Sequence, residues 1–368
     1  AHRPGRGPRT EVRPAVPPPL LPPRVRVLVP AAGRFSDQTS LFVEDGRIRW
    51  MGPEHGRSLR VGTVRLDAAG RYAVPGLFDT HVHSAWQNQQ TNEDAFIAFG
   101  LTSVRDTGGT LDLLTALDDR ANATSLAVPR YFYSGEIFEG LMPLWGDAFY
   151  SIGWAAEARA EVRNLKAWGA DFVKVYPSLP WHLQEVVAEE AHRVGLPVVG
   201  HGQSVEEITR RVVWGFTSLE HSGAVFSTYE DVHKMIAAAG IAADLTMSVG
   251  GGTLMRVSDP EWQNNWRVRE FVPEEVRRPG RGDGGPFPLG SVTQPRDELL
   301  QLYKPRFDQL MAARSRGVRM ASGTDALMGG VFFGLSLHWE IGQFADAAVP
   351  PIDVLRMAAE GAAALVGL

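Results

Sequence analysis

Cysteine is absent from this chain of 368 residues. Disulfide bonds and thiolate metal sites are therefore excluded, so any bound metal must be held by histidine, carboxylate or modified lysine side chains. The absence leaves the redox conditions of the protein's compartment open.

Long apolar runs and a strong excess of one charge are also missing. No run approaches the roughly 20 residues that a membrane-spanning helix needs, and the start AHRPGRGPRT lacks the apolar core of a signal peptide. The 42 acidic and 37 basic residues give a formal net charge of -5, which provides no electrostatic reason to bind nucleic acid or an anionic membrane. We expect a soluble protein, cytoplasmic or periplasmic, with a small-molecule substrate and the option of forming homo-oligomers.

The N-terminal region divides into two parts. Residues 1–25 are rich in Pro and Arg, which is typical of a linker or a disordered arm, and the start at Ala is expected of a chain processed or excised from a longer one. Residues 26–70 contain short alternating runs broken by Gly, Asp and Pro, with a hairpin signal at Asp45 and Gly46. They predict a small β element that leans on the rest of the chain.

Strand and helix patterns alternate after Ala73, as they do in a parallel sheet wound with helices. Eight strands are predicted, at residues 74–83, 102–106, 129–134, 172–176, 197–201, 217–221, 241–246 and 319–324. Helices are predicted between most of them, at residues 156–168, 182–194, 205–214, 229–239 and 296–316. A TIM-like barrel needs about 250 residues. We therefore predict an α/β fold, a TIM-like (β/α)8 barrel over residues 71–368, with a small, partly complete β-sandwich element from the N-terminal region.

One segment interrupts this alternation. Residues 250–295 contain RRPGRGDGGPFPLG, which is too rich in Gly and Pro for regular structure and follows the seventh predicted strand. We predict an irregular insertion that is either a lid over the active site or an excursion without a role.

Potential metal ligands stand at the ends of the predicted strands. His81 and His83 form an HxH triplet, and alternate residues of a strand point to one face, so both imidazoles can bind one cation. Two histidines on a strand are more often structural, but four further candidates follow at later strand ends: Lys174 in FVKVY, His201 in LPVVGHG, His221 in TSLEHS and Asp325 in ASGTDA. Because active sites of such barrels lie at the C-terminal strand ends, the six positions predict a metal centre there.

The motifs VPGLFDTHVH, VKVY, GHG, LEHS and SGTDA resemble the amidohydrolase superfamily, and within it the branch of imidazolonepropionases and prolidase-like carboxypeptidases. The resemblance covers about residues 40–368 and implies two divalent metal ions, expected to be zinc. His81, His83 and Asp325 would bind the more buried ion, and His201 and His221 the more exposed one. Lys174, carboxylated on its amine, would bridge both, because a carbamate offers two anionic oxygens to metals about 3.5 to 4 Å apart. The alternative for Lys174 is a strand-end ion pair with an acid.

Two features depart from the prolidase-like pattern. Residues 134–150 read SGEIFEGLMPLWGDAFY where many such relatives carry a glycine-rich histidine motif, and the chain ends at AAALVGL where relatives run on to complete a small β domain. These features resemble the amidohydrolase domains found behind TolB-like β-propellers, for which the Pro- and Arg-rich tract would be the linker.

Further residues are candidates for catalysis and substrate binding. Asp325 would take a proton from a hydroxide held between the metals and pass it to the leaving atom. Tyr176, two residues after Lys174, would hydrogen bond a developing oxyanion or pack against the lid. Arg105 would bind a substrate carboxylate or pair internally with an acid. Gln203 and Trp86 complete the predicted substrate contacts, with packing as the alternative for Trp86.

These observations lead to a binuclear metal-dependent hydrolase that cleaves an amide, with a dipeptide or an N-acyl amino acid as substrate. Hydrolysis of an ester, a lactone or an organophosphate is a second hypothesis, since the same hydroxide attacks any activated carbonyl or phosphoryl centre. A non-catalytic binding protein that kept the barrel is a third.

Overall fold

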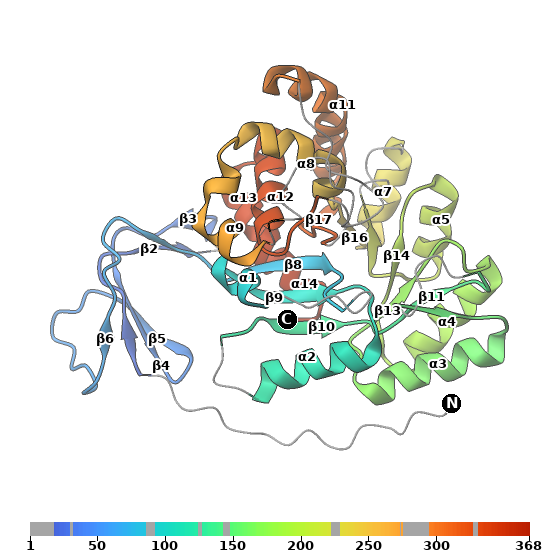
Figure 1. Cartoon of the computed structure of the whole chain (residues 1–368), viewed down its shortest axis with the longest axis horizontal. Coiled ribbons are helices and arrows are strands. Elements are labelled where there is room, and N and C mark those ends of the chain that lie inside the picture. The colour runs from blue at the N-terminus through green and yellow to red at the C-terminus, as the bar shows by residue number, and fades with distance from the viewer. Residues whose placement is uncertain are drawn as a thin grey trace.

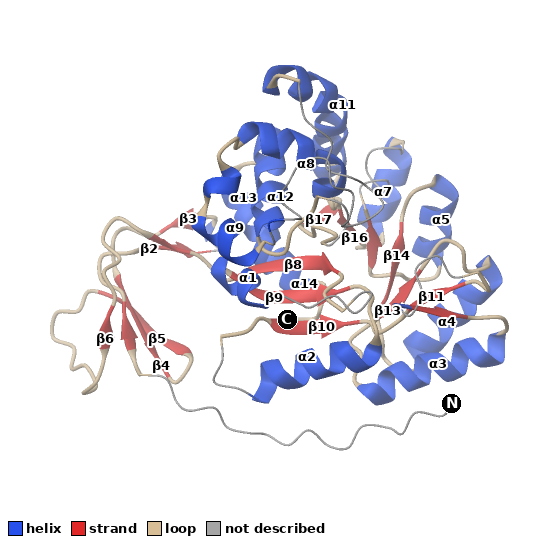
Figure 2. Ribbon diagram, in the orientation of Figure 1, coloured by secondary structure: helices blue, strands red, loops and turns tan. Residues whose placement is uncertain are grey.

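The computed structural model describes residues 18–29, 32–85, 93–123, 127–142, 148–221, 229–272, 274, 294–326 and 330–368. Two small N-terminal sheets lie to one side of a larger body in which helices surround parallel strands (Figure 1). Figure 2 shows the same division by element type, with the strands of the body inside and its helices outside. The architecture is α/β, as the alternating pattern predicts.

The N-terminal strands form two small sheets, in the orders β5-β4-β1-β6 and β3-β2-β7. Their bounds are β1 Leu20–Leu21, β2 Arg26–Val29, β3 Arg34–Phe35, β4 Ser40–Glu44, β5 Arg47–Gly52, β6 Val64–Arg65 and β7 Tyr72–Ala73. Asp45 and Gly46 join β4 to β5 with φ of 53° and 68°, the two positive angles that a tight hairpin turn requires. The predicted hairpin is confirmed.

The predicted boundary between arm and β element is too late. Leu20 and Leu21 already pair with β4 and β6, and Leu21 is fully buried. Burial of this leucine explains the pairing, because the apolar LL pair within the Pro-rich tract has a core to enter. Residues 1–17 of the predicted arm lie outside the described residues.

The body contains ten strands in two parallel sheets, ordered β10-β9-β8 and β12-β11-β13-β14-β15-β16-β17. The bounds are β8 Leu77–Val82, β9 Leu101–Asp106, β10 Arg130–Tyr133, β11 Ile137–Glu139, β12 Phe149–Ser151, β13 Val173–Val175, β14 Val198–His201, β15 Ser218–Glu220, β16 Ala242–Asp244 and β17 Arg319–Ala321. Backbone hydrogen bonds join the sheets at both margins, from His83 N to Ala326 O (2.6 Å) and from Asp171 N to Tyr133 O (2.9 Å). All eight predicted strands are present, each within a few residues of its expected bounds.

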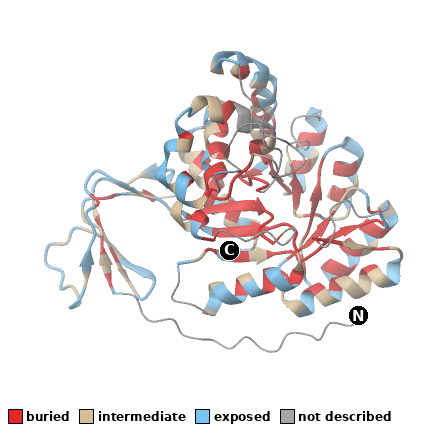
Figure 3. Ribbon diagram, viewed as in Figure 1, coloured by how far each residue is buried: buried red, intermediate tan, exposed pale blue. Residues whose placement is uncertain are grey.

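Helices connect the strands and cover their outer side. They are α1 Glu93–Ala98, α2 Leu111–Ala123, α3 Ala155–Trp168, α4 Trp181–Arg193, α5 Val205–Val213, α7 Glu230–Ala238, α8 Met247–Ser258, α9 Trp266–Phe271, α11 Arg296–Ser315, α12 Leu335–Asp346, α13 Pro351–Arg356 and α14 Ala362–Ala364, with a 3-10 turn at Trp262–Asn264 and a π turn at Met357–Gly361. The five helices predicted from the sequence match α3, α4, α5, α7 and α11 to within two residues at either end. In Figure 3 the strands of the body are buried and the outer faces of the helices exposed, which places the core between them.

The prediction of an irregular insertion over residues 250–295 is wrong for its first half. α8 and α9 occupy much of residues 247–271, and Trp262 stacks on Phe332 with 5.3 Å between ring centroids and meets Trp339 edge-on at 5.5 Å. The packing of these aromatic side chains thus stabilises helical structure in a segment whose glycine residues disfavour it. Residues 275–293, which include the Pro279 to Pro288 stretch, lie outside the described residues.

Two strands of the body have no counterpart in the sequence prediction. β11 and β12 follow β10, and β11 pairs with β13 through Phe138 and Val175. β11 lies in SGEIFEGLMPLWGDAFY and β12 overlaps its end, and glycine and proline residues of this segment interrupt any strand pattern. Their placement brings the start of the SGEIFEG segment to the edge of the candidate site.

Among the helices that the structure describes, none has both the length and the apolar character needed to cross a bilayer.

Candidate metal centre

Four histidines lie at or just beyond the C-terminal ends of three strands of the body. His81 and His83 belong to the end of β8, His201 ends β14, and His221 directly follows β15. The ring centroids of His81 and His221 are 4.9 Å apart and those of His201 and His221 are 4.3 Å apart. The structure therefore brings together imidazoles that are up to 140 positions apart in the sequence.

The outer nitrogens of His81 and His83 are engaged by protein oxygens. His81 Nδ1 lies 2.7 Å from a carboxylate oxygen of Glu220, and His83 Nδ1 lies 2.9 Å from the carbonyl oxygen of Gly108. Since these oxygens only accept, both Nδ1 atoms donate, which leaves Nε2 of each ring as a lone-pair donor. This arrangement of an acceptor behind a histidine is the one that metal sites use to fix the ligand ring.

His221 is oriented in the same way by a hydroxyl group. Its Nδ1 lies 2.9 Å from Thr246 Oγ1, and its Nε2 faces Nε2 of His201 at 3.3 Å. The side-chain amide of Gln203 lies 3.5 Å from Nδ1 of His201. Two imidazole lone pairs that face each other at this distance repel unless a proton or a cation lies between them, so the pair can share a proton or bind a metal ion.

Asp325 faces three of the four histidines. Its carboxylate oxygens lie 3.1 Å from His83 Nε2, 3.6 Å from His81 Nε2 and 3.7 Å from His221 Nδ1. The ligand atoms of His81, His83 and Asp325 lie close enough together to hold one metal ion. Burial raises the pKa of Asp325, but a proton on the facing imidazoles of His81 and His83 outweighs this effect and holds the pKa below its usual range.

Three residues of this centre have strained backbone conformations. His221, Thr246 and Asp325 have φ of 71°, 42° and 63°, a region that residues other than glycine rarely adopt. Such conformations cost on the order of 1–3 kcal/mol each and persist where the surrounding structure imposes them. The sharp turns after the strands aim these three side chains at one point.

Burial keeps the imidazoles of His81, His201 and His221 neutral. It lowers the pKa of His81 and His201 well below the usual value, and lowers the pKa of His221 to about 4. Neutral imidazole is the form that binds metals. The lowered pKa values and the ring orientations therefore both favour metal binding by these histidines.

Lys174 lies on β13 with its side chain inside the same cluster. The side chain is 1% exposed, and Nζ has no hydrogen-bond partner among the described residues. Burial lowers the pKa of the amine to about 8, although the carboxylates of Glu220 and Asp325 oppose the shift. An unpaired buried amine is costly, so its surroundings fit a covalent modification that would satisfy it.

Arg105 is a buried structural residue, and its predicted contact with a substrate carboxylate is not supported. Its guanidinium donates to both carboxylate oxygens of Glu220 (2.9 and 2.8 Å), to Asp244 (3.1 Å) and to the Thr80 carbonyl (2.6 Å). The structure shows the alternative, an internal pair with an acid, and the acids are Glu220 and Asp244. His81, Glu220 and Asp244 form a second group whose atoms lie close enough together to hold a metal ion. The Arg105 guanidinium, however, already binds both carboxylates of this group.

The remaining predicted site residues lie at the margin of the centre or outside the described chain. The Tyr176 ring meets His201 edge-on at 4.6 Å and Phe149 at 5.3 Å. Gln203 is exposed beside His201, where a capping box of Ser204 and Glu207 fixes the following turn. Trp86 lies outside the described residues.

Sequence reasoning missed the residues that hold the ligands in place. Glu220 stands directly before His221 on the buried strand β15, and its contacts with His81 and Arg105 show that it faces inward. Asp79 receives the Thr324 hydroxyl at 2.7 Å and ties the segment before Asp325 to β8. Thr246 gave no signal at all, because its contact with His221 depends on an unusual backbone angle.

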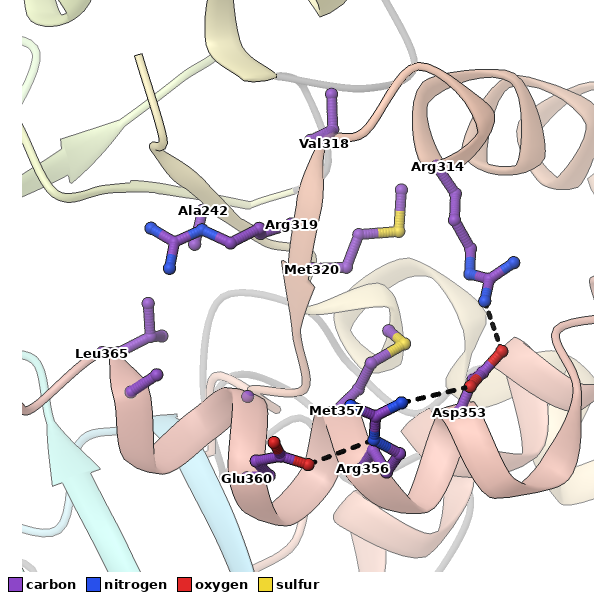
Figure 4. Close-up of a pocket in the computed structure, with 12 residues that line it drawn as sticks. Ala242, Arg314, Val318, Arg319, Met320, Asp353, Arg356, Met357, Glu360 and Leu365 are labelled. Atoms are coloured by element: carbon purple, nitrogen blue, oxygen red, sulfur yellow. Dashed lines mark hydrogen bonds and ion pairs between the residues drawn. The ribbon is translucent and has the colours of Figure 1, made fainter. Parts of the chain in front are cut away.

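A cavity of about 310 Å³ opens elsewhere in the body (Figure 4). Its lining includes Ala242 and Arg319, the first residues of β16 and β17, together with Met320, Met357 and Leu365. It therefore lies at the strand ends opposite to those that carry the histidines and Asp325. The reaction site is not this cavity.

Comparison with known proteins agrees with the geometry. The model of the amidohydrolase family matches residues 72–368. The chain belongs to the amidohydrolase family. The predicted resemblance is thus confirmed, and with it the expectation of an enzyme of the amidohydrolase type at the level of the family.

The curated relatives of this amidohydrolase match part of its length. A dihydroorotase of Pelobacter propionicus is 30% identical over 204 residues, covering 53% of this chain and 45% of that protein. An imidazolonepropionase of Saccharopolyspora erythraea is 41% identical over 63 residues, covering 17% of this chain and 16% of that protein. The chain thus spans less than half of the length of either relative.

Solved structures match nearly the whole chain. A Xaa-Pro dipeptidase with bound methionine in its active site has a TM-score of 0.69 at 19% identity, with coverage of 95% of this chain and 88% of that one. The ochratoxinase of A. niger has a TM-score of 0.64 at 20% identity, with coverage of 95% and 85%. At this identity the likeness is one of fold.

Proposed function

We propose that this amidohydrolase is a binuclear metal-dependent hydrolase of amide bonds, built on a closed (β/α)8 barrel. The observation that carries the proposal is the convergence of four imidazole Nε2 atoms and the Asp325 carboxylate around the buried Lys174 amine. The hydrogen bonds between β8 and Ala326, and between β10 and Asp171, support closure of the barrel.

The described donors divide into two sets. His81, His83 and Asp325 would hold one zinc ion, and His201 with His221 would hold a second. Two zinc ions in such a site lower the pKa of water to about 7 and polarise a carbonyl group. The neutral imidazoles and the carboxylate are the donor types that zinc prefers.

Lys174 would carry the carbamate that bridges the two sets. A carbamate forms from carbon dioxide and a neutral amine, and burial holds the pKa of this amine at about 8, so that a substantial neutral fraction exists at neutral pH. The product would replace an unpaired buried ammonium by an anion. The loss of the unpaired ammonium and the gain of an anion both favour the carbamate once cations are present.

Asp325 would move the proton during the reaction. Its low pKa keeps it ionised, so that it accepts a proton from water and then delivers it to the leaving nitrogen. Tyr176, packed on His201, would hydrogen bond the substrate carbonyl or carboxylate, and Gln203 would contact the substrate at the exposed side. Trp86 stays a predicted contact outside the described residues.

A dipeptide or an N-acyl amino acid with a bulky apolar part is the proposed substrate. Phe149, Ile137 and Ala148 form a small apolar cluster against which Tyr176 packs, and this cluster lies next to His201. It offers an apolar wall beside the reacting centre. The dipeptidase among the solved structures of this fold supports the same class.

The proposal is tested by metal analysis and a substrate panel. The zinc-loaded protein is expected to bind two equivalents and to hydrolyse apolar dipeptides or N-acyl amino acids faster than lactones, aryl esters or aryl phosphotriesters. Faster turnover of the esters or phosphotriesters would assign the site to the second hypothesis. Two bound metals without turnover of any class would favour the binding protein.

The role of Lys174 has its own test. Added bicarbonate is expected to increase zinc loading of the parent protein but not of Lys174→Ala, and short carboxylic acids are expected to restore part of the loading of the variant. Mass spectrometry after plasma ionisation measures the metal. Two bound metals and normal turnover in Lys174→Ala would show that Lys174 has no role in the site.

A further inference from the structure

We infer that Glu340, on α12, is a positioning residue for the candidate metal ligand His221, through the first turn of α8 and Thr246. The inference rests on the proposed function of His221. It begins with the way α8 starts.

Thr246 occupies the N-cap position of α8 but does not cap the helix. A threonine at this position usually accepts a hydrogen bond from a backbone N–H of the first turn. In this protein the side chain makes no such bond, and Oγ1 lies 2.9 Å from Nδ1 of His221. The hydroxyl is thus used by the histidine and withdrawn from the helix.

Glu340 supplies the missing cap. Its two carboxyl oxygens accept from the backbone N–H of Met247 (2.9 Å) and of Ser248 (2.7 Å), and the Ser248 hydroxyl lies 2.8 Å from the second oxygen. The carboxyl group is fully buried, and burial raises its pKa to about 8 against the effect of these bonds. A buried carboxyl at a helix N-terminus is costly to keep unless its bonds are needed there.

The two features together explain the backbone at Thr246. With φ of 42° the residue adopts a conformation that is unfavourable for a β-branched side chain. The bonds from Met247 and Ser248 to Glu340 fix the peptide that follows it, and α12 fixes Glu340 in turn. Without them, Thr246 would relax to an ordinary N-cap geometry and its hydroxyl would turn to the N–H groups of the first turn.

The consequence reaches the metal centre. Once the hydroxyl leaves Nδ1, the His221 ring loses the hydrogen-bond partner that orients it, and Nε2 no longer has to face His201. Losses of such supporting bonds typically weaken metal binding by about 10- to 100-fold. We expect metal binding by His201 and His221 to weaken, and metal binding by His81, His83 and Asp325 to stay unchanged.

Histidine ring spectra of the metal-free protein test the inference without any assay of activity. Nitrogen resonances of His221, assigned with His221→Gln, are expected to shift in Glu340→Gln and in Thr246→Val in the same direction, but to stay in place in Thr246→Ser. Leu337→Ala is the matched control, because it opens a cavity in the same helix α12 and leaves the cap intact. Unchanged His221 resonances in Glu340→Gln, or an equal shift in Leu337→Ala, would overturn the inference.

Cobalt titration gives the second measurement. Glu340→Gln is expected to bind the second Co²⁺ equivalent about 10- to 100-fold more weakly than the parent and the first equivalent unchanged. A parent that binds no metal would contradict the proposed function, while the ring spectra would still decide the role of Glu340. If Glu340→Gln does not fold, Ser248→Ala removes one bond of the cap and is expected to give a smaller shift in the same direction; no shift would overturn the inference.

Discussion

Asp325 combines two tasks in one carboxylate, because it faces the imidazoles of His81 and His83 and is proposed to carry the proton. Asp325→Asn keeps the size of the side chain and removes its basicity. We expect turnover to fall by at least about 100-fold, as is typical of lost proton transfer, when metal content is matched between the two proteins. Steady-state kinetics after metal analysis checks this. Turnover within a few-fold of the parent would leave Asp325 as a ligand only.

Glu220 offers a test of ligand support, since it accepts from His81 Nδ1 at 2.7 Å. Glu220→Gln puts an amide in its place, which weakens the acceptor and leaves Arg105 with one carboxylate less. We expect zinc affinity to fall by about 10- to 100-fold. Competition with a chelator measures it, and Glu136→Gln, another buried acid of the body, is the control. Equal affinity in Glu220→Gln and the parent would contradict the role.

At the scale of the residue, the sequence predicts the donors and misses their supports. The spacing of His81 and His83 is enough to place both rings on one face of a strand, because alternation is a local property. Glu220 and Thr246 act through contacts across the barrel, and Thr246 does so only in a left-handed backbone conformation. No local pattern reports such a contact. Arg105 shows the same limit, since its partners lie 115 and 139 residues away.

At the scale of the element, a buried carboxylate helps to join α3 and α4. Glu190 on α4 accepts from Arg193 on its own helix and, at 2.7 Å, from Arg163 on α3. These hydrogen bonds, that from Arg193 first, lower the pKa of Glu190 from 4.5 to about 2. The unfolded chain therefore binds more protons between these two values, so the stabilisation is complete above about pH 4.5 and is lost as the pH falls through about 2.

Glu190→Gln is expected to lower the free energy of unfolding by about 1 kcal/mol at neutral pH, because the arginines are partly exposed and screened by solvent. The difference from the parent should shrink as the pH falls below about 4.5. Urea unfolding of the metal-free protein across this range measures it. Glu189→Gln, on the exposed side of the same helix, is the control and should have little effect at any pH. A difference that stays constant with pH would show that the charge of Glu190 is not its cause.

The long helices were predicted, and so were eight of the ten strands that the structure describes in the body, but β11 and β12 were not. The patterns of α3, α4 and α11 extend over 13 to 20 residues, so one apolar face repeats several times. β11 and β12 have three residues each and no repeat. The prediction for the segment from α8 to α9 was wrong for another reason. Its glycines predict irregular structure, whereas the contacts of Trp262 with Phe332 and Trp339 stabilise helical structure. Packing against a distant helix cannot be read from the segment itself.

At the scale of the whole molecule, the candidate ligands connect β8, β13, β14, β15 and the segment after β17. Bound metal therefore favours the folded chain over the unfolded one. At a free metal concentration of about 100 times the dissociation constant, one such site contributes about 2.7 kcal/mol. Removal of metal with a chelator is expected to lower Tm by about 5 °C in calorimetry, and re-addition of zinc should restore it. An unchanged Tm would show that these strands are held without metal.

Arg105 also bears on how the chain folds. It belongs to β9, yet the groups that neutralise it, Glu220 and Asp244, come from β15 and β16. During synthesis the guanidinium must wait until more than a hundred further residues have been made before its partners exist. A nascent chain that closed around it earlier would trap an uncompensated charge. We therefore expect Arg105 to discourage premature collapse of the first strands of the body, and the native state to be reached in a late and slow step, because its contacts are far apart in the sequence.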